Sequence, residues 1–385
     1  QVNDRWVMRN SPIGVCMTGL NTLALEPFHA EQGAKFAPFA GYKMPIQYPL
    51  GVKGEHTHTR EAVGLFDVSH MGQISIEGPG STEALEKLIP AALQEMAPGQ
   101  IRYSQLTLEN GGILDDLMVT RWGNDSWGLV VNGACKHADM AHLKRNLPDS
   151  IQLTYFDAHA LVAVQGPEAR AALARLIPEA AELTFMRAVQ TSWNSHPVTL
   201  ACCGYTGEDG YEVSIANDSA RDLAEALTAL GESTWVGLGA RNSLRLETGL
   251  CLYGNDLTKE TSPIEADLLW SIQKRRRADG GFLGADIILK QISEGAPRKR
   301  VGVAPSDGRT PLRDHTILKN SAGDLIGEIT SGGFGPTHNG PVAMGYVSQD
   351  MSTLGTELIA EVRGKALPCS VCDPIFVQQR YVRSI

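Results

Sequence analysis

The chain has 385 residues, of which 43% are hydrophobic and 20% charged, and its formal net charge is −9. This length allows two or three domains with sizeable cores, and the composition is typical of a globular protein. The negative charge argues against a nucleic-acid-binding surface over the whole chain, and no apolar run approaches the roughly 18 residues that cross a bilayer. We therefore expect an enzyme of small molecules, with neither nucleic acid nor membrane among its partners.

The seven cysteines are odd in number and scattered along the sequence. This usage is typical of free thiols in a reducing compartment. Only Cys369 and Cys372 have metal or redox spacing, and without a second pair they do not make a four-ligand site, so we expect no metal. Residues 1–20 lack the apolar core of a secretory signal, and Met17 is the more natural beginning of the folded chain.

Residues 25–72 contain short apolar clusters without a long periodicity, so we expect them to be rich in loops. Residues 109–112 (ENGG) then predict a tight turn, and residues 113–120 a strand whose side chains alternate between two faces. Asp115 and Asp116 lie in this strand, on opposite faces and among apolar neighbours. An ionised carboxylate there needs hydrogen bonds, a cation or a ligand to offset its lost hydration. A functional carboxylate is one interpretation, and solvated aspartates on an edge strand are the other.

Two later segments repeat each other. Residues 74–79 and 162–167 both end in Gly-Pro, and each precedes a predicted helix that ends in Leu-Ile-Pro, at Pro90 and at Pro178. A strand-rich stretch follows each helix, which predicts two related α+β units, each a mainly antiparallel sheet with helices on one side. The short strands and turns after residue 298 predict a separate β barrel or sandwich.

The sequence between these parts offers further candidates. Residues 204–212 (GYTGEDGYE) match neither a dinucleotide fingerprint nor a P-loop, and we interpret them as a hairpin that delivers Glu212 onto the next strand. A helix is expected over residues 242–252. Two basic clusters, residues 274–277 and 298–300, are either solvated faces or a local positive patch.

Taken together, these motifs resemble those of the glycine cleavage T-protein (aminomethyltransferase) family. In chain order the matching blocks are FAGYKMP (39–45), LFDVSHMG (65–72), GGILDDLMVT (111–120), GYTGEDGYE (204–212), GLGARNSLRLETGLCLYGND (237–256) and ITSGGFGPTHNGPVAMGYV (329–347). Six ordered blocks make this a specific match. The resemblance implies an α+β fold of three domains around a folate channel: residues 20–70 with 159–257, residues 71–158 with 258–295, and a C-terminal β barrel over residues 296–385.

The resemblance also implies an activity, a co-substrate and a partner. A tetrahydrofolate-dependent transferase would convert the aminomethyl group on the lipoyl arm of H-protein to ammonia and 5,10-methylenetetrahydrofolate, in the bacterial cytoplasm or, alternatively, the mitochondrial matrix. Similar proteins include folate-dependent demethylases of small substrates. They also include non-catalytic, folate-binding iron–sulfur assembly factors, whose cysteine motif is matched only in part by LCLYGND (250–256).

Site residues are carried over one by one. Asp116 matches the catalytic aspartate, held near the folate N10, so we expect Asp115 to serve mainly stability. Glu212 matches the glutamate that binds the amino-pyrimidine edge of the pterin, where a carboxylate can accept two N–H bonds. The resemblance implies further binding residues at Arg241, Tyr103, Val131, Phe185, Tyr381 and Arg383. Because H-proteins of this system are acidic, as the resemblance implies, the two basic clusters predict a docking patch for the carrier.

Overall fold

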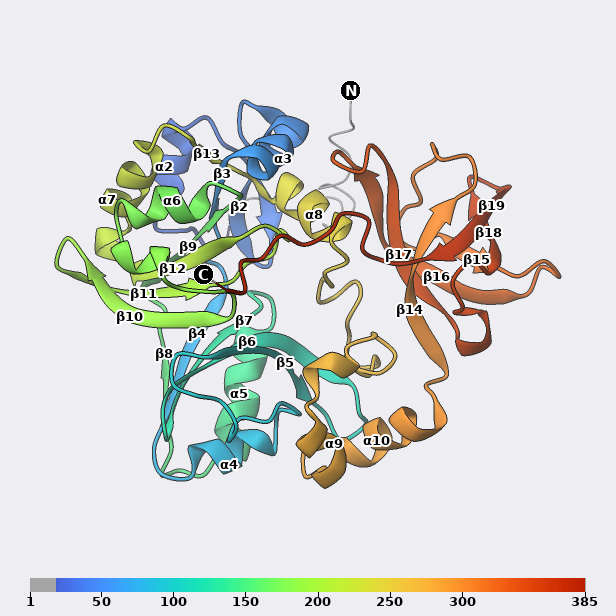
Figure 1. Cartoon of the computed structure of the whole chain (residues 1–385), viewed down its shortest axis with the longest axis horizontal. Helices are drawn as coiled ribbons and strands as arrows, with labels where there is room; N and C mark the ends of the chain where they lie inside the picture. Colours follow the sequence, from blue (N-terminus) through green and yellow to red (C-terminus); the bar gives the residue numbers. More distant parts are fainter. Residues whose placement is uncertain (1–18, 385) are drawn as a thin grey trace. The chain divides into compact units, whose positions relative to one another are not determined.

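The structure is a computed structural model that describes residues 19–384, so Met17 and Cys16 lie outside the described residues. The chain forms two compact units (Figure 1). Unit 1 contains the N-terminal segment through Gln73, Phe156–Leu244 and Gln379–Ile385, and unit 2 contains Ile74–Tyr155 and Arg245–Gln378. Among residues 19–384, no helix is long and apolar enough to cross a membrane.

Unit 1 is built on a six-stranded sheet. Its strand order is β10 (Arg187–Trp193), β11 (His196–Cys202), β12 (Gly210–Ala216), β9 (His159–Gln165), β3 (Val63–Asp67) and β13 (Ser233–Trp235). Only β13 runs parallel to its neighbour, β3. A two-stranded ribbon and five α-helices complete the described part of the unit: β1 (Lys35–Phe39), β2 (Tyr42–Gln47), α2 (Glu26–Glu31), α3 (Gly51–Glu61), α6 (Ala169–Ala174), α7 (Asn217–Thr228) and the first part of α8 (Leu238–Glu247).

The core of unit 1 lies between this sheet and its helices. Leu223 and Leu227 of α7 pack with Val162 of β9 and Val213 of β12, and all four are fully buried. Alternate residues of β9 and β12 therefore fill the core, and the residues between them face the other side of the sheet. Glu212 is one of these, which places it on the face opposite to Val213.

Unit 2 contains a five-stranded sheet and a barrel. The sheet order is β5 (Ile101–Thr107), β6 (Ile113–Gly123), β7 (Ser126–Val131), β4 (Gly72–Glu77) and β8 (Gln152–Tyr155), and α4 (Ser81–Glu86) and α5 (Lys136–Asn146) contribute to its core. The short helices α9 (Lys274–Asp279) and α10 (Ala285–Glu294) follow. The closed barrel has the order β14 (Arg298–Pro305), β17 (Gly340–Ser348), β16 (Leu325–Gly335), β15 (Ile317–Lys319), β18 (Glu357–Val362) and β19 (Lys365–Cys372).

The predicted repeat and the predicted barrel are both confirmed. Strand β4 passes through Gly78 into α4, and β9 passes through Gly166 into α6, with φ of 133° and 136° at the two glycines. This backbone conformation is open to glycine and strained for other residues, which explains why both copies have glycine before proline. The fold is α+β, with two sheet-and-helix parts and a C-terminal barrel, and the exact boundaries of three domains stay a prediction.

Two predictions of local structure were wrong. Residues 25–72 are not mainly loops, because they form α2, β1, β2, α3 and β3. The helix expected over residues 242–252 begins at Leu238 and ends at Glu247, two residues before Gly249 with its φ of 71°. Gly237 precedes its first turn, where a Cβ atom would lie 2.2 Å from the backbone of Ile46, so this glycine serves close packing.

Candidate functional site

The strand that carries the two aspartates is anchored at its first residue. A Cβ atom on Gly112 would lie 1.8 Å from the carbonyl oxygen of Lys259, so only glycine allows the two backbones to approach this closely. The next amide, of Ile113, donates to the carbonyl oxygens of Thr258 and Thr261 at 3.2 and 3.1 Å. The turn therefore fixes the position at which β6 presents its carboxylates.

The two aspartates differ in exposure, as the alternation of the strand predicts. Asp115 is fully buried together with Leu117 and Val119, whereas Asp116 and Met118 are only partly buried. Of the two carboxylates, Asp116 is thus the one that a ligand could reach. A partly buried carboxylate among apolar neighbours is typical of sites of acid–base chemistry.

Asp116 accepts two hydrogen bonds from side chains. The hydroxyl of Tyr103 donates to Oδ2 at 2.9 Å, and Nδ2 of Asn132 donates to Oδ1 at 2.7 Å. Burial and the nearby Asp115 raise the pKa of Asp116 to about 7, although both hydrogen bonds act in the opposite direction. A carboxyl group with this pKa can accept or release a proton near neutral pH, as general catalysis requires.

Asn132 connects the two aspartates, and sequence reasoning missed it. Its backbone N–H donates to Oδ2 of Asp115 at 2.9 Å, and its Nδ2 donates to Oδ1 of Asp115 at 2.9 Å as well as to Asp116. Although the aspartates belong to opposite faces of β6, both thus reach one amide at the end of β7. The available signal was a single polar residue directly after the apolar strand Leu129–Val131.

The structure places Tyr103 beside Asp116 and Val131 in the core of unit 2. Tyr103 is half-buried and stacks on Trp270, with ring centroids 5.4 Å apart and an interplanar angle of 23°. Val131 is fully buried in the core of unit 2, where it pairs with Leu117 on the Asp115 side of the sheet. Its neighbour Val130 is partly exposed and pairs with Met118. Val130 and Val131 thus lie on opposite faces of β7, and a role for Val131 in folate binding stays a prediction.

Glu212 and Arg241 come together in unit 1. Glu212 accepts a hydrogen bond from the thiol of Cys203 at 3.6 Å, and burial raises its pKa while the positive charge of Arg241 opposes this rise. Arg241 lies over the ring of Tyr205 at 4.7 Å. Its Nη1 is buried, and no acceptor for it exists within residues 19–384. A buried acceptor and an unsatisfied donor side by side are suited to a polar heterocycle.

The predicted residues near the C-terminus also belong to unit 1. Phe185 and Tyr381 stack face to face, with centroids 3.9 Å apart and rings 7° from parallel, and the guanidinium of Arg383 lies 4.9 Å from the centroid of Phe185. The amide of Phe185 donates to the carbonyl of Val382 at 2.8 Å. Tyr381 and Arg383, both from the C-terminal segment, thus contact the ring of Phe185.

The predicted residues therefore form groups within each of the two units. Unit 2 brings together Tyr103, Asp116 and Asn132, and unit 1 brings together Glu212 with Arg241, and Phe185 with Tyr381 and Arg383. No group of three or more metal-binding side chains exists in the described part of the chain. The six cysteines among residues 19–384 form no disulfide bond with one another. Cys251 is buried, and its burial raises the pKa of its thiol to about 12, which does not suit a reactive cysteine.

The basic clusters are not a free positive patch. Arg275 pairs with Glu86 and with Glu95, Arg276 is buried against Glu86, and Arg277 donates to the carbonyl oxygens of Leu269 and Ile272. In the second cluster, Arg298 pairs with Glu265, Lys299 with Asp267, and Arg300 donates to two backbone carbonyls. These arginines hold unit 2 together, which argues against a free positive patch at either cluster, and the docking surface for the carrier stays a prediction.

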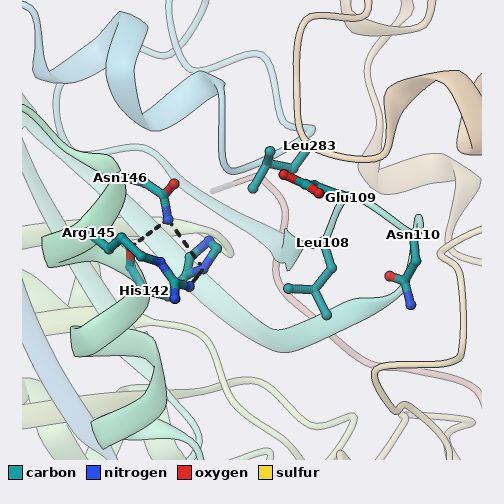
Figure 2. A pocket seen from close by; sticks show the side chains of 7 residues that line it. All are labelled: Leu108, Glu109, Asn110, His142, Arg145, Asn146 and Leu283. Atoms are coloured by element: carbon teal, nitrogen blue, oxygen red, sulfur yellow. Dashed lines mark hydrogen bonds between the residues drawn. The ribbon is translucent and has the colours of Figure 1, made fainter.

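A pocket of about 390 Å³ lies elsewhere in unit 2. Figure 2 shows His142, Arg145 and Asn146 of α5 on one side of this pocket and Glu109 with Leu283 on the other. Arg145 and Asn146 direct their side-chain nitrogens to Nδ1 of His142 at 3.4 Å. None of the predicted site residues lines it, and it therefore does not coincide with the carboxylate of Asp116.

The fold and the two groups define an α+β protein with a barrel, a reachable carboxylate of raised pKa and a buried Glu–Arg pair. Residues 25–276 match the model of the GCVT N-terminal domain, and residues 298–378 match the glycine cleavage T-protein C-terminal barrel domain. The chain belongs to the glycine cleavage T-protein family, whose curated members are aminomethyltransferases.

Named relatives agree over nearly the whole chain. The mitochondrial aminomethyltransferase of Mesembryanthemum crystallinum is 42% identical over 374 residues, covering 95% of this chain and 91% of the relative. The probable mitochondrial aminomethyltransferase of Schizosaccharomyces pombe is 37% identical and covers 98% of each chain. The crystal structure of the glycine cleavage system aminomethyltransferase T from Bartonella henselae superimposes with a TM-score of 0.90 at 44% identity, covering 94% of this chain and 99% of that one.

Proposed function

We propose that this chain is a tetrahydrofolate-dependent aminomethyltransferase that accepts an aminomethyl group from the lipoyl arm of H-protein and releases ammonia. The observation that carries this proposal is the carboxyl group of Asp116, half-buried, hydrogen-bonded by Tyr103 and Asn132, and with a pKa raised to about 7. The family relationship supports the substrates, because the relatives are aminomethyltransferases of the glycine cleavage system.

The chemistry explains why a carboxyl group of this kind is needed. Bridging two folate nitrogens with a methylene group removes one proton from each nitrogen, while the leaving ammonia and the freed lipoyl sulfur each take one. A group that shuttles protons near neutral pH serves these steps, and Asp116 would do so at the folate N10. Tyr103 and Asn132 would keep its carboxylate oriented.

Unit 1 would hold the pterin. Glu212 would accept two N–H bonds from the amino-pyrimidine edge, and the buried Nη1 of Arg241 would donate to a pterin acceptor. Phe185, which already stacks on Tyr381, would add an aromatic contact to the flat ring of the pterin. Tyr381 and Arg383 would contact the substrate from the C-terminal segment.

Turnover with aminomethylated H-protein, with and without tetrahydrofolate, tests the proposal directly. We expect ammonia release that depends on tetrahydrofolate, with 5,10-methylenetetrahydrofolate as the product. Accumulation of methyltetrahydrofolate from a small methylated substrate would instead indicate a demethylase. The curated relatives are mitochondrial forms, which favours the mitochondrial matrix over the bacterial cytoplasm as the compartment.

A further inference from the structure

A second buried carboxyl group lies behind the site and has no role in the proposed function. Asp139, in the first turn of α5, is fully buried, and neither of its oxygens has an N–H or O–H partner elsewhere in residues 19–384. Its side chain meets the carboxyl group of Asp115 within hydrogen-bonding range. Asp139 therefore touches the residue that holds Asn132, and not the expected substrate.

Two ionised carboxylates cannot hydrogen-bond each other, so a contact between them requires a proton. Asp115 already accepts two N–H bonds from Asn132, at 2.9 Å each, and these bonds favour its ionised form. Asp139 accepts none, and an ionised carboxylate without partners in a buried place is strongly disfavoured. The proton therefore belongs on Asp139.

We propose that Asp139 is a positioning residue that stays a neutral carboxylic acid and donates a hydrogen bond to Asp115, so that Asp115 keeps the amide of Asn132 aimed at Asp116. The order of contacts is Asp139, Asp115, Asn132 and Asp116. Its effect on turnover rests on the proposed role of Asp116, whereas the proton on Asp139 does not.

The surrounding charges agree with this assignment. Burial and the negative charge of Asp115 both raise the pKa of Asp139 well above its ordinary range, and Asp116 adds to this rise. The positive charge of Lys259 lowers the pKa of Asp139, but its effect is smaller than each of the effects that raise it. The titratable groups that face the pair come from β6, from the residue before α5 and from the segment after α8: Asp115, Asp116, Cys135, Tyr253 and Lys259.

Two variants, Asp139→Asn and Asp139→Ala, distinguish the loss of a hydrogen-bond donor at this position from the loss of a negative charge. The asparagine side chain keeps a donor of similar shape, whereas alanine removes it. Asp286→Asn is the matched control, because Asp286 also lies in the first turn of a helix of unit 2 but is exposed. The first measurement is the infrared spectrum of each folded protein without substrate at pH 7.

Asp116, with its pKa of about 7, contributes to the protonated-carboxyl band of every variant, so the spectra are compared as differences. We expect the wild-type spectrum minus that of Asp139→Asn to contain the band of one protonated carboxyl group, and the wild-type spectrum minus that of Asp286→Asn to lack it. Absence of the band from the first difference spectrum would overturn the proposal. Stability provides a second measurement. Because the pKa of Asp139 is raised on folding, its contribution is full below about pH 4 and is lost as the pH rises.

The unfolding constant of the wild type, relative to that of Asp139→Asn, should therefore rise by up to about tenfold per pH unit between pH 5 and 8. A flat ratio would show that Asp139 is ionised.

Turnover is the third measurement. The rate of Asp139→Ala should fall roughly tenfold or more, as expected for the loss of one hydrogen bond to a charged group, and Asp139→Asn should retain most of the wild-type rate. The acid limb of the kcat/KM profile should lie at the same pH in Asp139→Asn as in the wild type. If Asp139 were ionised, its replacement would remove a negative charge near Asp116 and move this limb to lower pH.

Discussion

The side-chain nitrogen of Asn132 lies 2.7 Å from Oδ1 of Asp116, while the same nitrogen lies 2.9 Å from Oδ1 of Asp115. One amide therefore couples two carboxyl groups that alternate across a strand. Any change in Asp115 reaches Asp116 through Asn132, although only Asp116 is open to a ligand. This coupling changes what the two aspartates are expected to do on mutation.

Asp116→Asn should remove most turnover while the protein stays folded. One positioned acid–base group is typically worth about 10²- to 10⁴-fold in rate. Asp115→Asn should mainly lower stability, because the new amide would place a donor against the N–H groups of Asn132. Its rate should fall as well, but by less, since Asn132 loses its anchor. Steady-state kcat and the thermal unfolding midpoint, measured on both variants, check this asymmetry, and equal losses of kcat in two stable variants would contradict it.

Tyr103→Phe should shift the pH dependence of the reaction. The hydroxyl of Tyr103 donates to Asp116 and thereby lowers its pKa, so removing it should raise that pKa further above its present value of about 7. If Asp116 acts as the base, the rate rises with pH through this pKa, and the acid limb of kcat/KM should move to higher pH. Tyr346→Phe is the control, because it loses a buried hydroxyl that donates to the carbonyl of Asp256 at 2.6 Å. A shift of equal size in both variants would rule out a specific effect on Asp116.

Glu212→Gln should weaken folate binding more than it slows the bound complex. A hydrogen bond to a charged partner contributes about 1.5 to 3 kcal/mol, which corresponds to a tenfold to hundredfold rise in Kd. Titration with tetrahydrofolate measures this rise directly. Glu225→Gln, an exposed change on α7, should leave the Kd unchanged. An unchanged Kd in Glu212→Gln would place the pterin elsewhere.

Much of this site followed from the sequence because its signals are local. The turn at Gly111 and Gly112 and the period of a strand predicted that Asp115 and Asp116 would lie on opposite faces, and the family resemblance indicated Asp116 as the functional one. The Gly-Pro repeat predicted the strand-to-helix junctions at Gly78 and Gly166. This signal is local as well, because a backbone with positive φ favours glycine.

The misses depend on contacts between distant residues. Asn132 and Asp139 are ordinary polar residues in the sequence, and their importance comes from packing against β6. Val131 lies in the core because one step along a strand reverses the face on which a side chain lies. Arg275 and Arg276 resembled a solvated or docking surface in the sequence, yet their partners Glu86 and Glu95 lie about 180 residues earlier in the chain.

The last prediction tests the structural role of those arginines. Arg276 is 4% exposed, its Nη2 donates to the carbonyl oxygen of Glu86, and its guanidinium lies over the ring of Phe282 at 5.3 Å. Arg276→Ala should therefore lower the free energy of unfolding by about 1 to 3 kcal/mol, because a buried acceptor loses its donor. Lys274→Ala is the control on the same helix, since Lys274 is exposed. Neither change should alter how KM for H-protein depends on salt. A folded Arg276→Ala variant with unchanged stability and a flattened salt dependence would restore the docking patch that the structure argues against.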